Sequence, residues 1–205
     1  MPHFTKRQKN EMTAHSFMRM AIFLVLTAVF AALSVVALIA NSSEAKRRYE
    51  ALIATDQAGG DVEAALNDLR GYIYSHMNTT IGSETGIRPP IQLKGTYDRL
   101  VAAEKERVRQ INEPLQATAQ AECERQNPTD FSGRNRVPCV TEYVDKFGAK
   151  EQPIIESLYM FDFASPRWSP DLAGFSVLTT VVCGFVALID IALYRRTRHL
   201  VRNSR

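Results

Sequence analysis

The sequence has few of the residues from which most catalytic and metal sites are built. It contains three cysteines and four histidines in 205 residues, and His76 is the single histidine between positions 41 and 171. It has no G-x-S-x-G, H-E-x-x-H, phosphate-binding loop or dinucleotide fingerprint. The cysteines form no C-x-x-C pair and have no histidine nearby, which disfavours a zinc site. We therefore expect no enzymatic activity, no metal and no cofactor.

Charge is missing from two long stretches near opposite ends of the chain. Residues 20–40 form an apolar run of 21 residues without a charged side chain. Residues 172–194 form a second run of 23 residues, in which Asp190 is the one charged residue. An α-helix rises about 1.5 Å per residue, so either run covers the roughly 30 Å hydrocarbon core of a bilayer. The sequence predicts two transmembrane helices.

The first run leaves an alternative open, because a basic stretch precedes it. Lys6, Arg7 and Lys9 resemble the basic start of a secretory signal, and Val35 and Ala37 fit a cleavage pattern. The apolar core of a signal usually has only about 7 to 15 residues, so an uncleaved anchor is favoured. The segment that follows is exported under either interpretation.

The basic residues near the ends of the runs predict the orientation of the chain. Nine lysines and arginines lie in residues 1–19 and 195–205, whereas four lie near the inner ends of the runs: Lys46, Arg47, Arg48 and Arg167. Both termini are therefore predicted to be cytoplasmic, with residues 41–171 outside the plasma membrane. The exported stretch carries 16 basic and 20 acidic side chains, so we expect no nucleic-acid binding.

The apolar spacing of the exported stretch is mainly helical. Apolar side chains recur every three or four residues in three segments: 61–77, 94–126 and 139–147. Pro114 predicts a kink or a break near Asn112 and Glu113, since proline removes a helical hydrogen bond. We predict a bundle of three or four helices over residues 41–157, which a second copy of the chain could complete.

The helix predicted just after the first run has two alternative starting points. Residues 44–57 place Ala45, Tyr49 and Leu52 on one face, and this helix could continue directly from the membrane as one rod. Alternatively it restarts at Asn41, because Asn41 and Glu44 have the N-x-x-E spacing of a capping box. The sequence does not choose between them.

The last part of the exported stretch, residues 158–171, differs from the rest. Its aromatics alternate with other residues, and Pro166 and Pro170 flank Trp168. We predict an extended, membrane-proximal segment, with Trp168 and Tyr194 as anchors at the two membrane interfaces. The alternative is that this aromatic segment is a docking surface for a partner.

The two cysteines of the exported stretch, Cys123 and Cys139, are predicted to form a disulfide. Fifteen residues separate them, including a polar, turn-rich loop. Closing a loop of this size contributes about 3 kcal/mol in the chain-entropy model. The alternative is a pair of free thiols in a reducing compartment. Cys183 lies within the second run and is expected to act as a small apolar residue.

The second run has a face of small and polar residues. At about 100° per residue six side chains fall in one narrow band: Ala173, Ser176, Thr180, Cys183, Ala187 and Asp190. Such a face allows close packing on the first run or on a second copy, and a conduction pathway is the alternative. Asp190 is predicted to form an intramembrane ion pair with Arg19 or Arg195, and a proton or ion relay is the alternative.

The layout resembles the input half of bacterial chemoreceptors and sensor kinases. The elements in common are residues 1–19 (basic N-terminus), 20–40 (anchor), 41–157 (exported helical domain), 158–171 (membrane-proximal segment), 172–194 (second anchor) and 195–205 (basic tail). Those families carry a cytoplasmic output region after the second anchor, whereas here 11 residues follow Tyr194. The stretches LRGYIYSHMN, IQLKGTYDRLVAAEK and SPRWSPDLAG also resemble uncharacterised bacterial two-span membrane proteins.

The sequence therefore predicts an all-α membrane protein, in which two transmembrane helices flank an extracytoplasmic helical bundle. Its partners are expected to be the lipid bilayer and either a protein or a second copy. The leading hypothesis is a non-enzymatic accessory or sensor-like subunit whose exported domain binds a partner protein or envelope component. The alternative is a homo-oligomeric transport or channel component assembled through the second transmembrane helix. A membrane-anchored enzyme ranks last.

Overall fold

A computed structural model describes residues 6–79, 81, 88–129 and 133–203. Over this part of the chain the predicted helical class is confirmed, with five α-helices, one short 3-10 helix and two short strands. The chain divides into two compact units: unit 1 comprises Met1–Leu52, Glu63–Arg88 and Asp162–Arg205, and unit 2 comprises Ile53–Val62 and Pro89–Phe161. The ends of the two predicted cytoplasmic segments, residues 1–5 and 204–205, lie outside the described residues.

The first helix, α1 (Lys6–Ala58), is 53 residues long and passes without interruption through the first apolar run. The prediction of a helix restarting at Asn41 is therefore wrong, and the continuous rod is the observed alternative. The Asn41 side chain does not cap the helix but donates to the backbone oxygen of Met77 and to the carboxylate of Asp171. Because the helix continues through this point, its backbone groups need no side-chain cap there.

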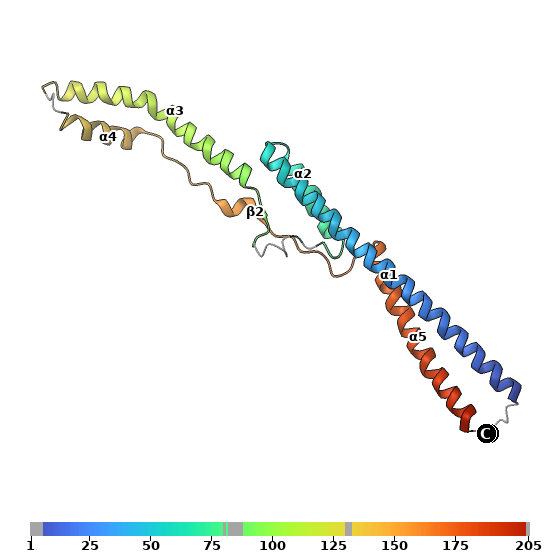
Figure 1. The fold of residues 1–205 in the computed structure, drawn as a ribbon. Helices are drawn as coiled ribbons and strands as arrows, with labels where there is room; N and C mark the ends of the chain where they lie inside the picture. The colour runs from blue at the N-terminus through green and yellow to red at the C-terminus, as the bar shows by residue number, and fades with distance from the viewer. Residues whose placement is uncertain (1–5, 80, 82–87, 130–132, 204–205) are drawn as a thin grey trace. The chain divides into compact units, whose positions relative to one another are not determined.

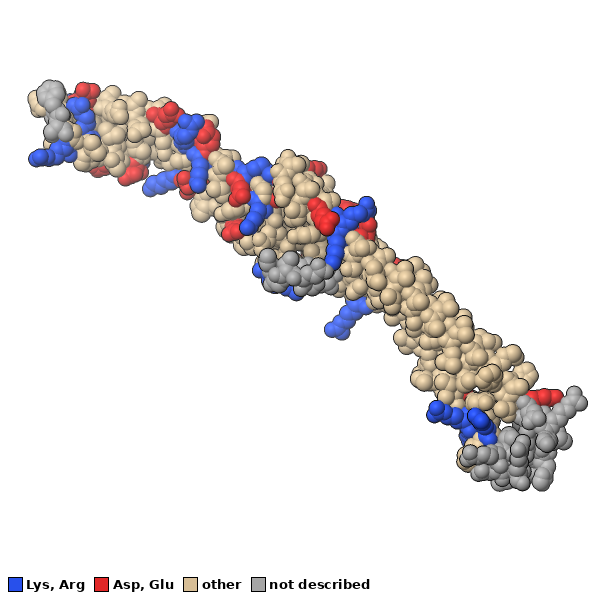
Figure 2. Space-filling model, viewed as in Figure 1, with Lys and Arg blue, Asp and Glu red and all other residues tan. Residues whose placement is uncertain are grey.

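The last helix, α5 (Leu172–Asn203), lies beside α1 within unit 1 (Figure 1). Contacts between them recur along their length, from the ring pair of Phe17 and Tyr194 to the hydroxyl pair of Ser34 and Thr180, whose oxygens are 3.3 Å apart. Among the described residues, α1 and α5 are the two helices long and apolar enough to cross a membrane. Figure 2 shows an uncharged surface along the middle of this pair, with charged side chains near its lower right end.

The second helix, α2 (Val62–Ser75), packs on the part of α1 that follows the apolar run. Gly59 has a φ of 70°, a left-handed conformation that suits glycine and ends α1. Four side chains of unit 1 are fully buried between the two helices: Ala45, Leu52, Leu69 and Ile73. These belong to the apolar stripes that the helical spacing predicts.

Unit 2 is built on α3 (Lys94–Gln126) and α4 (Arg136–Phe147), which form a hairpin. The predicted break near Asn112 does not occur, because α3 is a single helix with Pro114 inside it. Pro114 is exposed, so water can reach the carbonyl that its missing N–H leaves free. The helix α4 begins three residues before the predicted Cys139, since Pro138 in its first turn is compatible with a helix.

The two strands of unit 2 join the segment before α3 to the segment after the 3-10 helix. Strand β1 (Ile91–Gln92) pairs antiparallel with β2 (Met160–Phe161), with Ile91 opposite Phe161. A 3-10 helix, η1 (Glu156–Tyr159), precedes β2. The predicted extended segment from residue 158 therefore begins with the end of a helical turn and a strand that pairs inside unit 2.

Candidate functional site

The two cysteines that lie between the apolar runs are joined in unit 2. The sulfur atoms of Cys123 and Cys139 are 1.96 Å apart and link the end of α3 to the first turns of α4. Cys123 and Ala119 are the buried residues of α3, and no residue of α4 is fully buried. The hairpin therefore has a thin apolar core, and the covalent link adds to the few contacts that hold α4 in place.

The small face of α5 is covered by α1 within the same chain. Five of its six predicted members are buried: Ala173, Ser176, Cys183, Ala187 and Asp190. Thr180 is half-buried and meets Ser34 of α1. Each hydroxyl on this face also donates to a carbonyl of its own helix, as Thr180 does to Ser176. The face thus serves helix packing, with its polar groups satisfied locally.

Asp190 is paired with α1 rather than with its own helix. Its Oδ1 lies 3.1 Å from the Nη2 of Arg19, and no ion pair with Arg195 is found among the described residues. The Asp190 side chain is buried, whereas that of Arg19 is 64% exposed. The other carboxylate oxygen, Oδ2, is buried without a hydrogen-bond partner in the described part of the chain. This pair fixes the register of α1 against α5 near their cytoplasm-facing ends in the predicted topology.

The two predicted interface anchors lie at opposite ends of the apolar part of α5. Trp168 precedes the helix and packs edge-on against Phe175, with ring centroids 5.8 Å apart. Tyr194 lies near the other end and contacts Phe17 of α1 at 5.9 Å. The apolar stretch between them contains most of the exposed large side chains of α5.

Sequence reasoning missed a polar cluster where α5 begins. Asp171 caps this helix, since its Oδ1 accepts from the backbone N–H of Gly174 and from the hydroxyl of Ser169. Its Oδ2 accepts from Asn41 at 2.7 Å. Burial acts to raise the pKa of Asp171, but these hydrogen bonds outweigh it and hold the pKa below its usual value. The cluster ties the start of α5 to α1 and, through Met77, to the segment after α2.

A second missed residue is Asp56, a buried carboxylate of unit 2. It accepts hydrogen bonds from the backbone N–H groups of Gly95 and Thr96, both at 2.8 Å, and from the Thr96 hydroxyl at 2.6 Å. Arg99 lies 3.6 Å from the same carboxylate and donates to the Asp56 carbonyl. A Cβ on Gly95 would come within 2.6 Å of that carbonyl oxygen, so this contact requires glycine. Asp56 thus supplies the N-terminal cap that α3 lacks in its own sequence.

After α4 an extended segment, residues 149–154, returns along α3 and is held there by side chains of the helix. The Asn112 amide both donates to and accepts from the backbone of Ala149, at 3.0 and 2.8 Å. Arg107 donates to the Lys150 carbonyl, and Glu104 accepts from the Gln152 N–H at 2.8 Å. Glu104, Arg107 and Asn112 follow one another at intervals of three and five residues on α3, so that their side chains reach peptide groups along the extended segment. These side-chain hydrogen bonds hold the extended segment on the helix.

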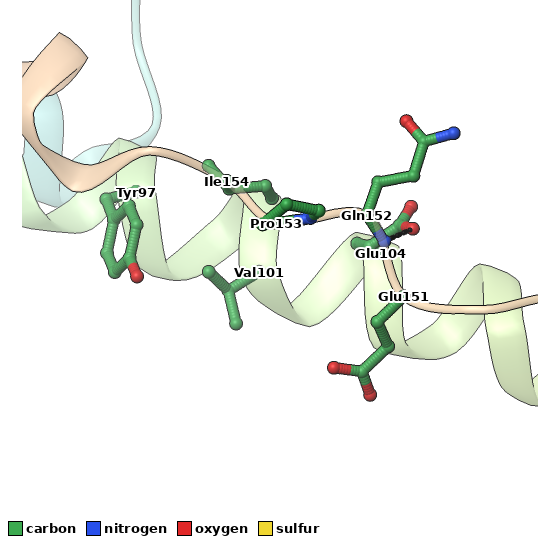
Figure 3. Close-up of a pocket in the computed structure, with 7 residues that line it drawn as sticks. All are labelled: Tyr97, Val101, Glu104, Glu151, Gln152, Pro153 and Ile154. Carbon is green, nitrogen blue, oxygen red and sulfur yellow. Dashed lines mark hydrogen bonds between the residues drawn. The ribbon is translucent and has the colours of Figure 1, made fainter.

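A groove opens where the extended segment crosses the first half of α3 (Figure 3). Its volume is about 350 Å³, and Tyr97, Val101 and Glu104 of α3 face Glu151, Gln152, Pro153 and Ile154 of the extended segment across it. The apolar surface is supplied by Tyr97, Val101, Pro153 and Ile154. This volume lies within the range of roughly 300–1,000 Å³ typical of small binding sites.

The sequence contained part of the signal for these missed sites. Asp56 stands at the end of a helical pattern near Gly59 and Gly60, but its target, residues 95–96, is some 40 positions away and has no spacing relation to it. The groove depends on a segment, residues 149–154, that lacks any period.

Comparison with known proteins finds no match to this chain. No protein-family model matches the chain, no curated protein matches its sequence, and no solved structure matches its fold.

Proposed function

We propose that the chain is a two-span plasma-membrane protein with both termini in the cytoplasm and residues 41–171 outside. The distribution of side chains on α1 and α5 supports membrane insertion. Their buried residues are small or polar, such as Ser34 and Ala187, whereas large apolar residues, such as Val25 and Phe185, are more than 60% exposed. In water this distribution would be inverted, but it suits helices surrounded by lipid.

We propose further that the exported region binds a partner protein or envelope component and that the chain acts as an accessory or sensor-like subunit. The observation that carries this proposal is the groove on α3, an open concave surface in a unit with little core of its own. The helix α1 continues without a break beyond the end of the first apolar run, which supports a sensor-like role, because a continuous helix is a stiff connection out of that run.

The homo-oligomeric transport alternative receives less support. It requires the small face of α5 to meet a second copy, and α1 of the same chain already packs on that face through Ser34. The hydroxyls there bond to their own helices. A conduction pathway along this face would need those contacts to open.

Crosslinking in living cells tests the proposed function. A chain with an affinity tag is crosslinked, the membranes are solubilised gently, and co-purifying proteins are identified by mass spectrometry. We expect a reproducible membrane or envelope protein that is absent when residues 89–161 are replaced by a flexible linker. Recovery of multimers of the chain alone would refute partner binding and favour the homo-oligomeric alternative.

A further inference from the structure

Exposed apolar side chains follow or precede the lining residues of the groove in the chain. Beyond Ile154 the chain passes to Ile155 and Leu158, whose side chains are 59% and 66% exposed. On α3, Leu100 stands next to Val101 and is 39% exposed. Large apolar side chains gathered on an aqueous surface mark sites of interaction more often than scattered ones do. Leu100 and Ile155 are the direct sequence neighbours of Val101 and Ile154, which line the hollow of about 350 Å³.

The two carboxylates of the groove differ in what they contact. Glu104 accepts from the Arg107 guanidinium through both oxygens, at 2.7 and 2.8 Å, and also from the Gln152 N–H. These donors lower the pKa of Glu104 to about 2. The Glu104 carboxylate therefore binds Arg107 and helps to hold the extended segment on the helix.

The Glu151 carboxylate differs from that of Glu104. It is exposed, and it makes no hydrogen bond or ion pair with any other residue that the structure describes. In Figure 3 its carboxylate lies on the same side of the extended segment as the Tyr97 phenol and Val101, whereas Gln152 points to the opposite side. A negative charge without a partner among the described residues thus stands at one end of a groove of mixed polar and apolar surface, and an aromatic ring stands at the other end.

We propose that this groove binds a segment of a partner protein that carries a lysine or arginine next to apolar side chains. The cation would pair with Glu151, its aliphatic stem would lie on Val101 and Ile154, and neighbouring apolar side chains would cover Ile155 and Leu158. Long basic side chains bury their stems on apolar surface while the charged end stays polar, which is the arrangement this groove offers. The inference rests on the proposed function, since it names the chemistry of the expected partner.

The negative charge of Glu151 favours a basic polypeptide over the other classes of ligand that the groove could bind. A phosphate-rich polymer or an anionic lipid headgroup would meet Glu151 with a like charge. A metal ion would find too few ligands, because no group of three or more histidine, cysteine, aspartate or glutamate side chains among the described residues is placed to hold one. A basic polypeptide segment satisfies both the charge and the apolar surface.

Site-specific photocrosslinking in living cells tests this assignment on the full chain. A photoreactive benzoylphenylalanine replaces Ile155, which lies beside the groove without lining it, and the crosslinked peptides are sequenced. We expect adducts to one protein, at a segment with a lysine or arginine beside apolar residues. Glu151→Gln should lower the adduct yield about threefold to fivefold, as expected for a single partly exposed ion pair, and Glu151→Arg should lower it further.

The matched control is Glu142→Gln, which removes an exposed acid from α4 away from the groove and should leave the yield unchanged. Mobility on non-reducing gels checks that the Cys123–Cys139 link, and with it the hairpin, is intact in each variant. Unchanged yield in Glu151→Gln, adducts at segments without a basic residue, adducts only to lipid or to a second copy, or no adducts would each overturn the assignment. If a partner still co-purifies after general crosslinking in those cases, the proposed function stands and only the groove assignment falls.

Discussion

Replacing Asp56 by alanine removes the carboxylate that caps α3. Three hydrogen bonds disappear, from the Gly95 and Thr96 N–H groups and from the Thr96 hydroxyl, in a site where Asp56 is 2% exposed. A capping side chain contributes about 0.5–2 kcal/mol, and a hydrogen bond to a charged group about 1.5–3 kcal/mol. Because the three bonds share one carboxylate and water can reach part of the opened site, we expect a loss of about 3 kcal/mol in the local stability of α3.

Hydrogen exchange measured by mass spectrometry on the full chain in lipid nanodiscs reads out this loss. A change of about 3 kcal/mol corresponds to a roughly 100-fold faster exchange of amides that open with the first turns of α3. The amides to follow are those of residues 98–104, since they do not themselves bond to Asp56. Glu50→Ala is the control, an exposed acid on the same helix α1. If Asp56→Ala accelerates exchange no more than about threefold over this control, the capping role is refuted.

Three further predictions follow from the other contacts. Arg19→Gln should lower the melting temperature of the protein in detergent, because it leaves the buried Asp190 carboxylate as an unpaired charge. Adding Asp190→Asn removes that charge and should recover part of the lost melting temperature. A double variant that melts at the same or a lower temperature than Arg19→Gln would contradict the pairing. The pKa of Glu104 is lowered from 4.5 to about 2 by its hydrogen bonds from Arg107 and the extended segment, so its stabilising effect is complete above pH 4.5 and is lost as the pH falls towards 2. Hydrogen exchange of the extended segment should follow this acid transition, and Glu104→Gln should abolish the dependence. Cys123→Ser should lower the stability of the α3–α4 hairpin by about 3 kcal/mol, measured by urea-dependent proteolysis, and an unchanged urea midpoint would refute this.

The features that sequence could predict are those set by local spacing. The apolar runs, the stripe on α2 and the small face of α5 each repeat with a helical period, so residues such as Leu69 and Ala187 are buried where the period places them. The positions of Cys123 and Cys139 within one turn-rich stretch likewise limited the pairing to one choice. Each of these predictions needed only residues that are near one another in the chain.

The features that sequence missed depend on residues far apart in the chain. Asp56 contacts Thr96 because α1 ends beside the start of α3, and neither helix carries a sequence pattern that predicts this contact. Pro114 was predicted to kink or break its helix, and α3 continues through it without a break, since hydrogen bonds from Asn112 and ion pairs such as Arg109 with Glu113 hold the surrounding turns. Local rules give the cost of such a residue, whereas the surrounding contacts decide whether the helix tolerates it.

The position of the exported region outside the membrane is the claim on which the partner, the oxidised cysteines and the interface anchors all depend. Labelling with a membrane-impermeant maleimide in intact cells tests it directly, using Ser157→Cys in unit 2 and His199→Cys near the end of α5, both of which are exposed positions. We predict that Ser157→Cys is labelled in intact cells and that His199→Cys is labelled only after the membrane is permeabilised. Labelling of His199→Cys in intact cells, with Ser157→Cys protected, would show that residues 41–171 are not outside the membrane.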